Sequence, residues 1–219
     1  MIGHPNLVGY WPLNENGNEL INGMTATLYN TPTFQSGIRG QGLTTAYTGI
    51  KCAYIPANSL FRVTRDVTLS AFCYLISDND VSNEIISLTA DSIGNGAYAL
   101  YITTSARIAT FYARNATTGY KQASASPAIS TGVWNHICGT YDGSYNRIYI
   151  NGNLSAQTAN TGNITYVTTN NHLTIGSAGI TVPTRASNII IDDCQIYNIA
   201  LTASDIKRIM QGLHPLTRS

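Results

Sequence analysis

The sequence predicts an all-β domain, a sandwich of two antiparallel sheets with one short helix near the C-terminus. Hydrophobic residues make up 43% of the 219-residue chain, enough for a sizeable core, while charged residues make up only 11%. The remaining polarity comes mainly from Ser, Thr, Asn and Gly, a composition that favours strands and turns over helices. Short β-rich runs also recur between turn signals along the whole chain, which is typical of a sandwich.

Runs rich in β-branched and aromatic residues are expected to form the strands. They are Leu7–Trp11, Ala53–Ile55, Val67–Ile76, Ala97–Ile102, Arg107–Tyr112, Trp134–Tyr141, Asn146–Ile150, His172–Ile175 and Ile189–Tyr197. Within the third run, alternate residues from Leu69 to Cys73 fall on one face and those from Ser70 to Tyr74 on the other. This alternation suits two stacked sheets.

Local turn and capping signals add a hairpin and the helix. Asn151-Gly152 can supply the positive φ angles of a type I′ turn, which predicts a hairpin between the flanking strands. Near the C-terminus, Thr202 begins a sequence with the spacing of a capping box, and an apolar stripe runs from Ile206 to Met210. Gly212 is placed to end this helix, which should dock on the sandwich.

Domain organisation and charge are simple. With no internal repeat and no dividing linker, residues 1–212 are expected to form one domain and residues 213–219 a C-terminal tail. Twelve Lys and Arg nearly balance eleven Asp and Glu, which gives a formal net charge of +1 and little support for nucleic-acid binding. The N-terminal residues lack the features of a signal peptide, and the apolar runs are too short to insert in a membrane as helices.

The cysteines are predicted to be core side chains. Cys52, Cys73, Cys138 and Cys194 are widely separated, each in an apolar run, without the close pairing of metal knuckles or redox motifs. A free cysteine packs as a small hydrophobic residue, so this pattern fits folding in a reducing compartment. A disulfide is the alternative.

Several segments together resemble a known family. They are Leu7–Glu15, Ser36–Leu43, Tyr54–Pro56, Val67–Phe72, Trp134–Gly143, Ile148–Gly152 and Ile191–Asn198, followed by Ala200–Ile206. In this order they are similar to the laminin-G-like jelly-roll domain of the concanavalin A-like lectin/glucanase superfamily. The resemblance implies a two-sheet jelly-roll sandwich in which Trp11, Trp134 and His136 are framework residues with a packing role.

A catalytic role is not expected. Glucanases of the same superfamily need a nucleophile and an acid/base carboxylate about 5 Å apart. The glutamates are Glu15, Glu19 and Glu84, and none belongs to a cluster of alternating acids. Asp192 and Asp193 are adjacent, so on a regular strand they point to opposite faces unless a bulge intervenes. We therefore predict that the chain is not an enzyme.

Calcium is the most credible ion. Many relatives hold a structural calcium between an N-terminal loop and the last core strand, and calcium takes carboxylate, amide and backbone oxygens. By this resemblance, the candidate ligands are Asn14, Glu15 and Glu19 in the loop, and Asp193 on the strand. The alternative is a solvated loop, with Asp193 hydrogen-bonded to nearby backbone amides.

The chain is rich in tyrosine, with fourteen tyrosines against four phenylalanines. A tyrosine face can cover the apolar C–H surface of a sugar while its hydroxyl stays hydrated, so Tyr112, Tyr120 and Tyr145 are candidate ligand-binding residues. The loops Asp78–Asn83 and Asn115–Gln122 are candidates for lining a site. The alternative for each tyrosine is an ordinary place on a half-exposed strand.

The resemblance implies a non-catalytic module that binds glycans or proteins, as found in secreted bacterial proteins and in virions. Without a signal peptide, and with cysteines that look reduced, the chain is predicted to be a bacteriophage virion component, such as a capsid decoration or a head or tail fibre protein. It would assemble in the host cytoplasm with capsid or other virion proteins and contact cell-surface glycans, and a homo-oligomer is a further expectation. The alternative is an extracellular bacterial lectin or adhesion module.

Overall fold

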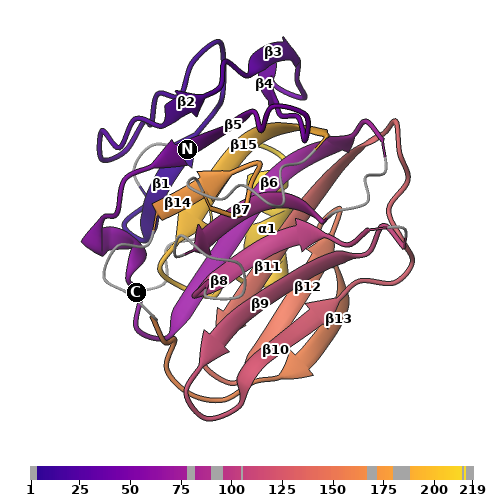
Figure 1. Cartoon of the computed structure of the whole chain (residues 1–219). Coiled ribbons are helices and arrows are strands. Elements are labelled where there is room, and N and C mark those ends of the chain that lie inside the picture. The colour runs from indigo at the N-terminus through magenta and orange to yellow at the C-terminus, as the bar shows by residue number, and fades with distance from the viewer. Residues whose placement is uncertain are drawn as a thin grey trace.

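The computed structural model describes residues 4–77, 82–89, 96–104, 106–166, 172–179, 188–213 and 215, in which two antiparallel sheets stack face to face (Figure 1). The eight-stranded sheet contains β1 (Leu7–Trp11), β3 (Thr33–Ser36), β4 (Gln41–Thr44), β6 (Asp66–Leu75), β11 (Trp134–Asp142), β12 (Tyr145–Ile150), β13 (Asn153–Ala159) and β15 (Ile189–Tyr197). The seven-stranded sheet contains β2 (Thr27–Tyr29), β5 (Cys52–Ile55), β7 (Asn83–Thr89), β8 (Tyr98–Ile102), β9 (Ala109–Asn115), β10 (Gly119–Ser124) and β14 (His172–Ile175). A 3-10 helix spans Ser59–Phe61, and α1 spans Ala203–Met210.

Both sheets mix strands from distant parts of the chain. The eight-stranded sheet has the order β13-β12-β11-β6-β15-β4-β3, and β1 pairs with β15. The seven-stranded sheet has the order β10-β9-β8-β7-β14-β5-β2. At one side of the sandwich the two terminal strands, β10 and β13, approach each other (Figure 1). This arrangement confirms the predicted two-sheet sandwich.

The predicted alternation along β6 is confirmed. Leu69, Ala71 and Cys73 lie in the core between the sheets. Ser70 and Phe72 face the other way, since they pair with residues on the outer face of β11. All four cysteines are free and buried, as predicted.

Helix α1 covers the outer face of the eight-stranded sheet. Its Ile206 and Ile209 join a second apolar cluster with Cys138, Tyr149 and Tyr197 from that face. The predicted capping box is present, because the side chain of the N-cap residue accepts from the third helical N–H and the third side chain accepts from the N-cap N–H. In the described part of the chain, no helix has both the length and the apolar character needed to cross a membrane.

The framework residues differ in burial. Trp11 is fully buried, and its indole N–H donates to the Met24 carbonyl at 3.0 Å. His136 is 2% exposed, and burial, assisted by the Arg39 charge, lowers its pKa to about 3. Trp134 is only half-buried, with its ring 5.7 Å from that of Tyr74. Full burial is therefore confirmed for two of the three.

Some predicted segments differ from the structure. The hairpin at Asn151-Gly152 is confirmed, with φ angles of 50° and 76°. The segment 115–122, expected as a loop, is instead a hairpin in which Gly119–Gln122 already belong to β10. Of the other predicted loop, residues 78–81 lie outside the described residues and Asn83 begins β7. The tail 213–219 also lies mostly outside the described residues.

Strand β15 contains a bulge at its two adjacent acids, the exception to the predicted alternation of Asp192 and Asp193. The register between β15 and β6 shifts between Asp192 and Gln195, and Asp193 has a φ of 54°. An extra residue in one strand bends it and re-aims side chains. As a result, both Asp192 and Asp193 contact Arg39, in the turn between β3 and β4.

Candidate functional site

The predicted calcium residues lie around β1 and the loop after it. Glu19 is 7% exposed, and its carboxylate accepts four backbone N–H bonds. One oxygen accepts from Tyr10 at 2.9 Å and Ile21 at 2.8 Å, and the other from Asn22 at 2.6 Å and Met24 at 3.3 Å. Hydrogen bonds from N–H groups to a carboxylate are charge-assisted, so Glu19 fixes the shape of the loop.

Asp193 is held by other partners. The Tyr10 hydroxyl donates to one carboxylate oxygen at 2.6 Å, and the Arg39 guanidinium forms an ion pair with the other. Arg39 also donates to the Met210 carbonyl at the end of α1, at 2.6 Å. Burial and the adjacent Asp193 charge raise the pKa of Tyr10 well above its usual value, so Tyr10 stays a neutral donor. Arg39 thus supplies a cation beside Asp193.

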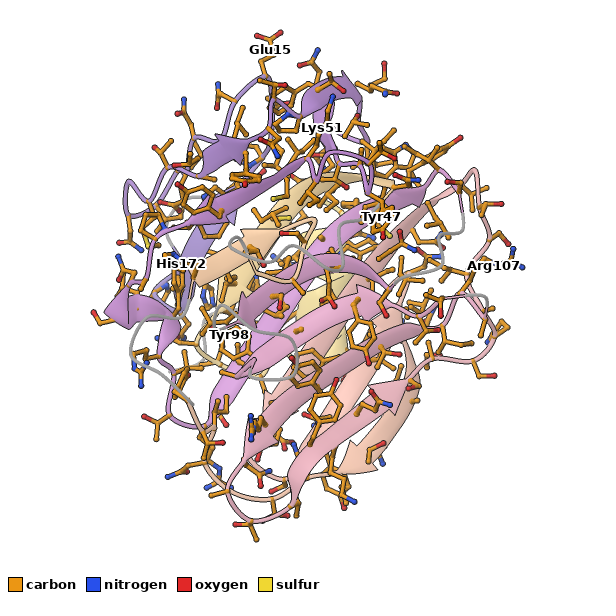
Figure 2. The ribbon with its side chains drawn as sticks, viewed as in Figure 1. Glu15, Tyr47, Lys51, Tyr98, Arg107 and His172 are labelled. Carbon is orange, nitrogen blue, oxygen red and sulfur yellow. The ribbon has the colours of Figure 1, made fainter. Side chains whose placement is uncertain are left out.

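The other two predicted ligands lie in the loop after β1. Asn14 accepts from the Gln41 N–H at 2.7 Å. Glu15 is exposed and projects outward from the loop (Figure 2). In the part of the chain that the structure describes, no group of three or more His, Cys, Asp or Glu is arranged to hold a metal ion.

Calcium binding at Asn14, Glu15, Glu19 and Asp193 stays a proposal. An ion there would have to displace the N–H groups around Glu19 and the guanidinium beside Asp193. Thermal unfolding of EDTA-treated protein before and after addition of calcium chloride tests it, because an ion that binds only the folded state raises the unfolding temperature. The same temperature in both samples would contradict the proposal.

Among the acids near these residues, Asp192 has the most strongly shifted pKa. One of its oxygens accepts from the N–H groups of Ile38 at 2.8 Å and Arg39 at 2.9 Å. The other is buried and has no hydrogen-bond partner among the described residues. Burial, followed by repulsion from Asp193, raises the pKa of Asp192 to about 6 against the backbone N–H bonds that lower it.

This shift predicts a pH dependence of stability. The folded state holds the Asp192 proton more tightly than the unfolded state, whose ordinary pKa is 3.8, so this contribution to stability is complete below about pH 4 and is lost as the pH rises to about 6. Asp192→Asn removes the titration. We expect the stability of the variant, relative to the wild type, to rise by about 2–3 kcal/mol between pH 4 and pH 7. Urea unfolding at both pH values measures the difference, and a constant difference would contradict the prediction.

A group of tyrosines lies on the outer face of the seven-stranded sheet. Neighbouring residues on the same strands, Leu100 and Phe111, point into the core, so the alternate residues Tyr101, Tyr112 and Tyr120 point away from it. We call these three residues the tyrosine face. Their strands β8, β9 and β10 are adjacent in the sheet (Figure 1).

The rings of the tyrosine face contact one another. The Tyr112 and Tyr120 rings are 4.3 Å apart and tilted by 45°, while Tyr101 meets Tyr112 edge-on at 6.3 Å. The Tyr101 hydroxyl donates to the side-chain oxygen of Gln122 at 2.7 Å. Tyr112 is 6% exposed and Tyr120 is 46% exposed, so Tyr120 presents the accessible ring and Tyr112 supports it.

The third predicted tyrosine is elsewhere. Tyr145 begins β12 in the eight-stranded sheet. The next side chain, Asn146, enters the sandwich, where it accepts from the Ala113 N–H at 3.2 Å and donates to the Lys121 carbonyl at 2.9 Å. Tyr145 therefore faces the opposite side of the molecule, and the Arg147 guanidinium lies 5.1 Å from its ring centre. The structure brings together Tyr112 and Tyr120 but not Tyr145.

Tyr101 was not predicted, and Gln122 was included only as the last residue of the candidate loop Asn115–Gln122. Tyr101 lies in a run in which every residue is buried, and its role depends on the pairing of β8 with β9. Gln122 lies directly opposite Tyr112 once β10 is registered against β9. A hairpin prediction over residues 109–124, with alternate residues on one face, would have placed Gln122 beside Tyr112, whereas Tyr101 lies on β8 outside that hairpin.

One family profile matches most of the chain. The profile of the concanavalin A-like lectin/glucanases superfamily matches residues 48–207. No curated protein sequence matches the chain.

Several solved structures share the fold at low identity. Domain 4 of AbnA, an extracellular arabinanase from Geobacillus stearothermophilus, in complex with arabinotriose, matches with a TM-score of 0.72 and 14% identity over 94% of this chain and 98% of that domain. The binding domain of Paraclostridial Mosquitocidal Protein 1 matches with a TM-score of 0.74 and 14% identity over 94% of this chain and 52% of that one. Trypanosoma rangeli sialidase matches with a TM-score of 0.68 and 15% identity over 95% of this chain and 33% of the sialidase. This chain thus spans about a third of the sialidase and about half of the toxin domain.

Proposed function

Because this chain belongs to the concanavalin A-like lectin/glucanases superfamily, we propose that it is a non-catalytic carbohydrate-binding module whose tyrosine face stacks against a saccharide. The main observation behind this proposal is that the exposed Tyr120 ring packs against the Tyr112 ring, with the two ring centres 4.3 Å apart. An aromatic ring fixed by a neighbour presents apolar surface without a further loss of side-chain freedom on binding.

Polar side chains near the rings could exchange hydrogen bonds with the hydroxyls of a sugar. The amide of Gln122 is oriented by the Tyr101 hydroxyl, and the hydroxyl of Thr110 donates to that of Ser124 at 3.3 Å. A sugar ring has apolar C–H faces and hydroxyls at its edge. Its C–H face would lie on Tyr120 while its hydroxyls exchange hydrogen bonds with these side chains and with water.

The comparisons support the proposal by analogy of fold. The arabinanase domain was solved with arabinotriose, and this chain covers nearly all of that domain. The sialidase was solved in complex with sialic acid, but this chain spans only a third of the sialidase, so its activity is not transferred. A binding role fits a domain that lacks the clustered glutamates of a retaining glucanase.

Tyr120→Ala is expected to weaken saccharide binding about three- to tenfold, because removing one aromatic contact costs roughly 0.5–1.5 kcal/mol. A glycan array identifies a ligand of the intact chain, and titration calorimetry then compares the variant with the wild type. Tyr145→Ala is the matched control, since Tyr145 is 38% exposed but lies on the other sheet. Equal affinities of the wild type and Tyr120→Ala would exclude the tyrosine face.

The biological setting is part of the proposal. The extracellular arabinanase relative supports an extracellular glycan-binding role, while the predicted virion role, with capsid partners and a homo-oligomer, stays a prediction. Mass spectrometry of purified phage particles and of culture medium separates these two settings. A hydrolase assay on the glycans that bind tests the non-catalytic assignment.

A further inference from the structure

A pocket lies at the side of the sandwich where β10 and β13 approach each other. It has a volume of about 420 Å³ and is formed where residues 126–130 pass the β12–β13 hairpin. We call it the edge pocket. None of the residues that line it carries a charge. Its volume lies in the range of small-molecule sites.

Three asparagine amides provide the polar part of the edge pocket. Asn151 donates to the Asn135 side-chain oxygen, Asn135 to the Val133 carbonyl, and Asn153 to the Asn151 carbonyl, each at 3.3 Å. An amide nitrogen carries two N–H donors, and each of these nitrogens makes one long hydrogen bond within the described part of the chain. Further donor capacity therefore remains in a neutral setting.

Aliphatic side chains provide the apolar part. Val133 is 48% exposed and Leu154 is 50% exposed, although both line the edge pocket. Ser126 and Ser155 fix the adjoining wall, because the Ser126 N–H donates to the Ser155 hydroxyl at 3.0 Å and that hydroxyl donates to the Ser126 carbonyl at 3.1 Å. The wall is thus held in place before any ligand arrives.

We infer that the edge pocket is a second saccharide subsite, selective for neutral sugars, an inference that rests on the proposed function. Amide donors suit hydroxyl groups, and exposed aliphatic groups suit the C–H surface of a sugar ring. A sugar with a carboxylate or ammonium group would find no countercharge there and would lose part of its hydration. Selectivity for neutral sugars follows from the missing charges.

The edge pocket and the tyrosine face are connected by β10. Tyr120 lies near the start of this strand, and Ser126 follows its end by two residues. At about 3.3 Å per residue, the six steps from Tyr120 to Ser126 span at most about 20 Å. Two subsites at this separation would bind one oligosaccharide more tightly than either subsite alone.

NMR of the ¹⁵N-labelled full chain tests the inference with three neutral probes, arabinotriose, xylotriose and maltotriose, and with acidic sialyllactose. We expect a neutral probe to shift the side-chain amide resonances of Asn135, Asn151 and Asn153, and Asn153→Asp to weaken this binding at least fivefold. Gln157→Glu is the control, since it makes the same charge change at an exposed position on β13 outside the edge pocket.

The outcomes separate the two proposals. Shifts confined to Tyr120 and its neighbours would overturn the edge pocket and leave the carbohydrate-binding function standing. Equal loss in Asn153→Asp and Gln157→Glu, or stronger binding of sialyllactose at the asparagines, would also overturn the inference. No shift with any probe would count against both proposals.

Discussion

Trp11→Ala is expected to lower the free energy of unfolding by about 3–5 kcal/mol, the usual cost of deleting a large buried aromatic side chain. Trp11 is fully buried between the sheets, with its ring centre 6.3 Å from that of Phe61. Its ring also lies against Gly9, where a Cβ would overlap it. Alanine would leave a cavity. It would also leave the Met24 carbonyl without the indole N–H that now donates to it.

Trp134→Ala is the matched control. Trp134 is half-buried on the outer face of the eight-stranded sheet, where it packs on Tyr74. We expect this variant to lose about 1 kcal/mol, because only part of its surface is withdrawn from water. Urea unfolding followed by far-ultraviolet circular dichroism measures both variants, and equal losses would contradict the assignment of Trp11 to the core.

Arg39→Met is expected to lower the free energy of unfolding by about 2–4 kcal/mol, because it leaves a buried carboxylate without its partner. Asp193 is 2% exposed, whereas the Arg39 side chain is 31% exposed, so solvent reduces the loss below that of a fully buried pair. Methionine keeps an unbranched apolar side chain but also removes the guanidinium that lies 5.0 Å from the Phe72 ring centre. The loss of stability should therefore come mainly from the removal of the guanidinium charge.

A double-mutant cycle isolates the pair. Asp193→Asn removes the carboxylate, and asparagine tolerates the positive φ of this bulge position. We expect the double variant, Arg39→Met with Asp193→Asn, to be more stable than Arg39→Met alone, because the unpaired charge is gone. Urea unfolding of all four proteins gives the coupling energy. Additive losses would show that Arg39 acts through α1 and not through Asp193.

The sequence predicted most of the buried strands, because each carries an apolar pattern, although β7 was not among the predicted runs. Leu7–Trp11, His172–Ile175 and Ile189–Tyr197 have the predicted bounds. The short strands β2 and β3 were missed, since they are mostly exposed or half-buried and show no apolar alternation. For these two strands, pairing with β5 and β4 decides the structure, and composition alone does not reveal it.

The candidate site was harder to predict because it depends on register. Tyr112 and Tyr120 could be proposed individually, but their contact requires β9 and β10 to pair as they do. Tyr145 failed to join them because its strand belongs to the other sheet. The bulge at Asp193 is likewise set by the long-range contacts of its carboxylate and not by local propensity.

The position of β15 has a consequence for biosynthesis. This strand pairs with β1, β4 and β6, so the middle of the eight-stranded sheet stays open until residues 189–197 have left the ribosome. A nascent chain that lacks them would expose the unpaired edges of strands made much earlier, and such edges promote aggregation. Completion of this sheet is therefore expected to wait for the synthesis of β15, and premature termination before Ile189 should yield insoluble fragments and no smaller functional domain.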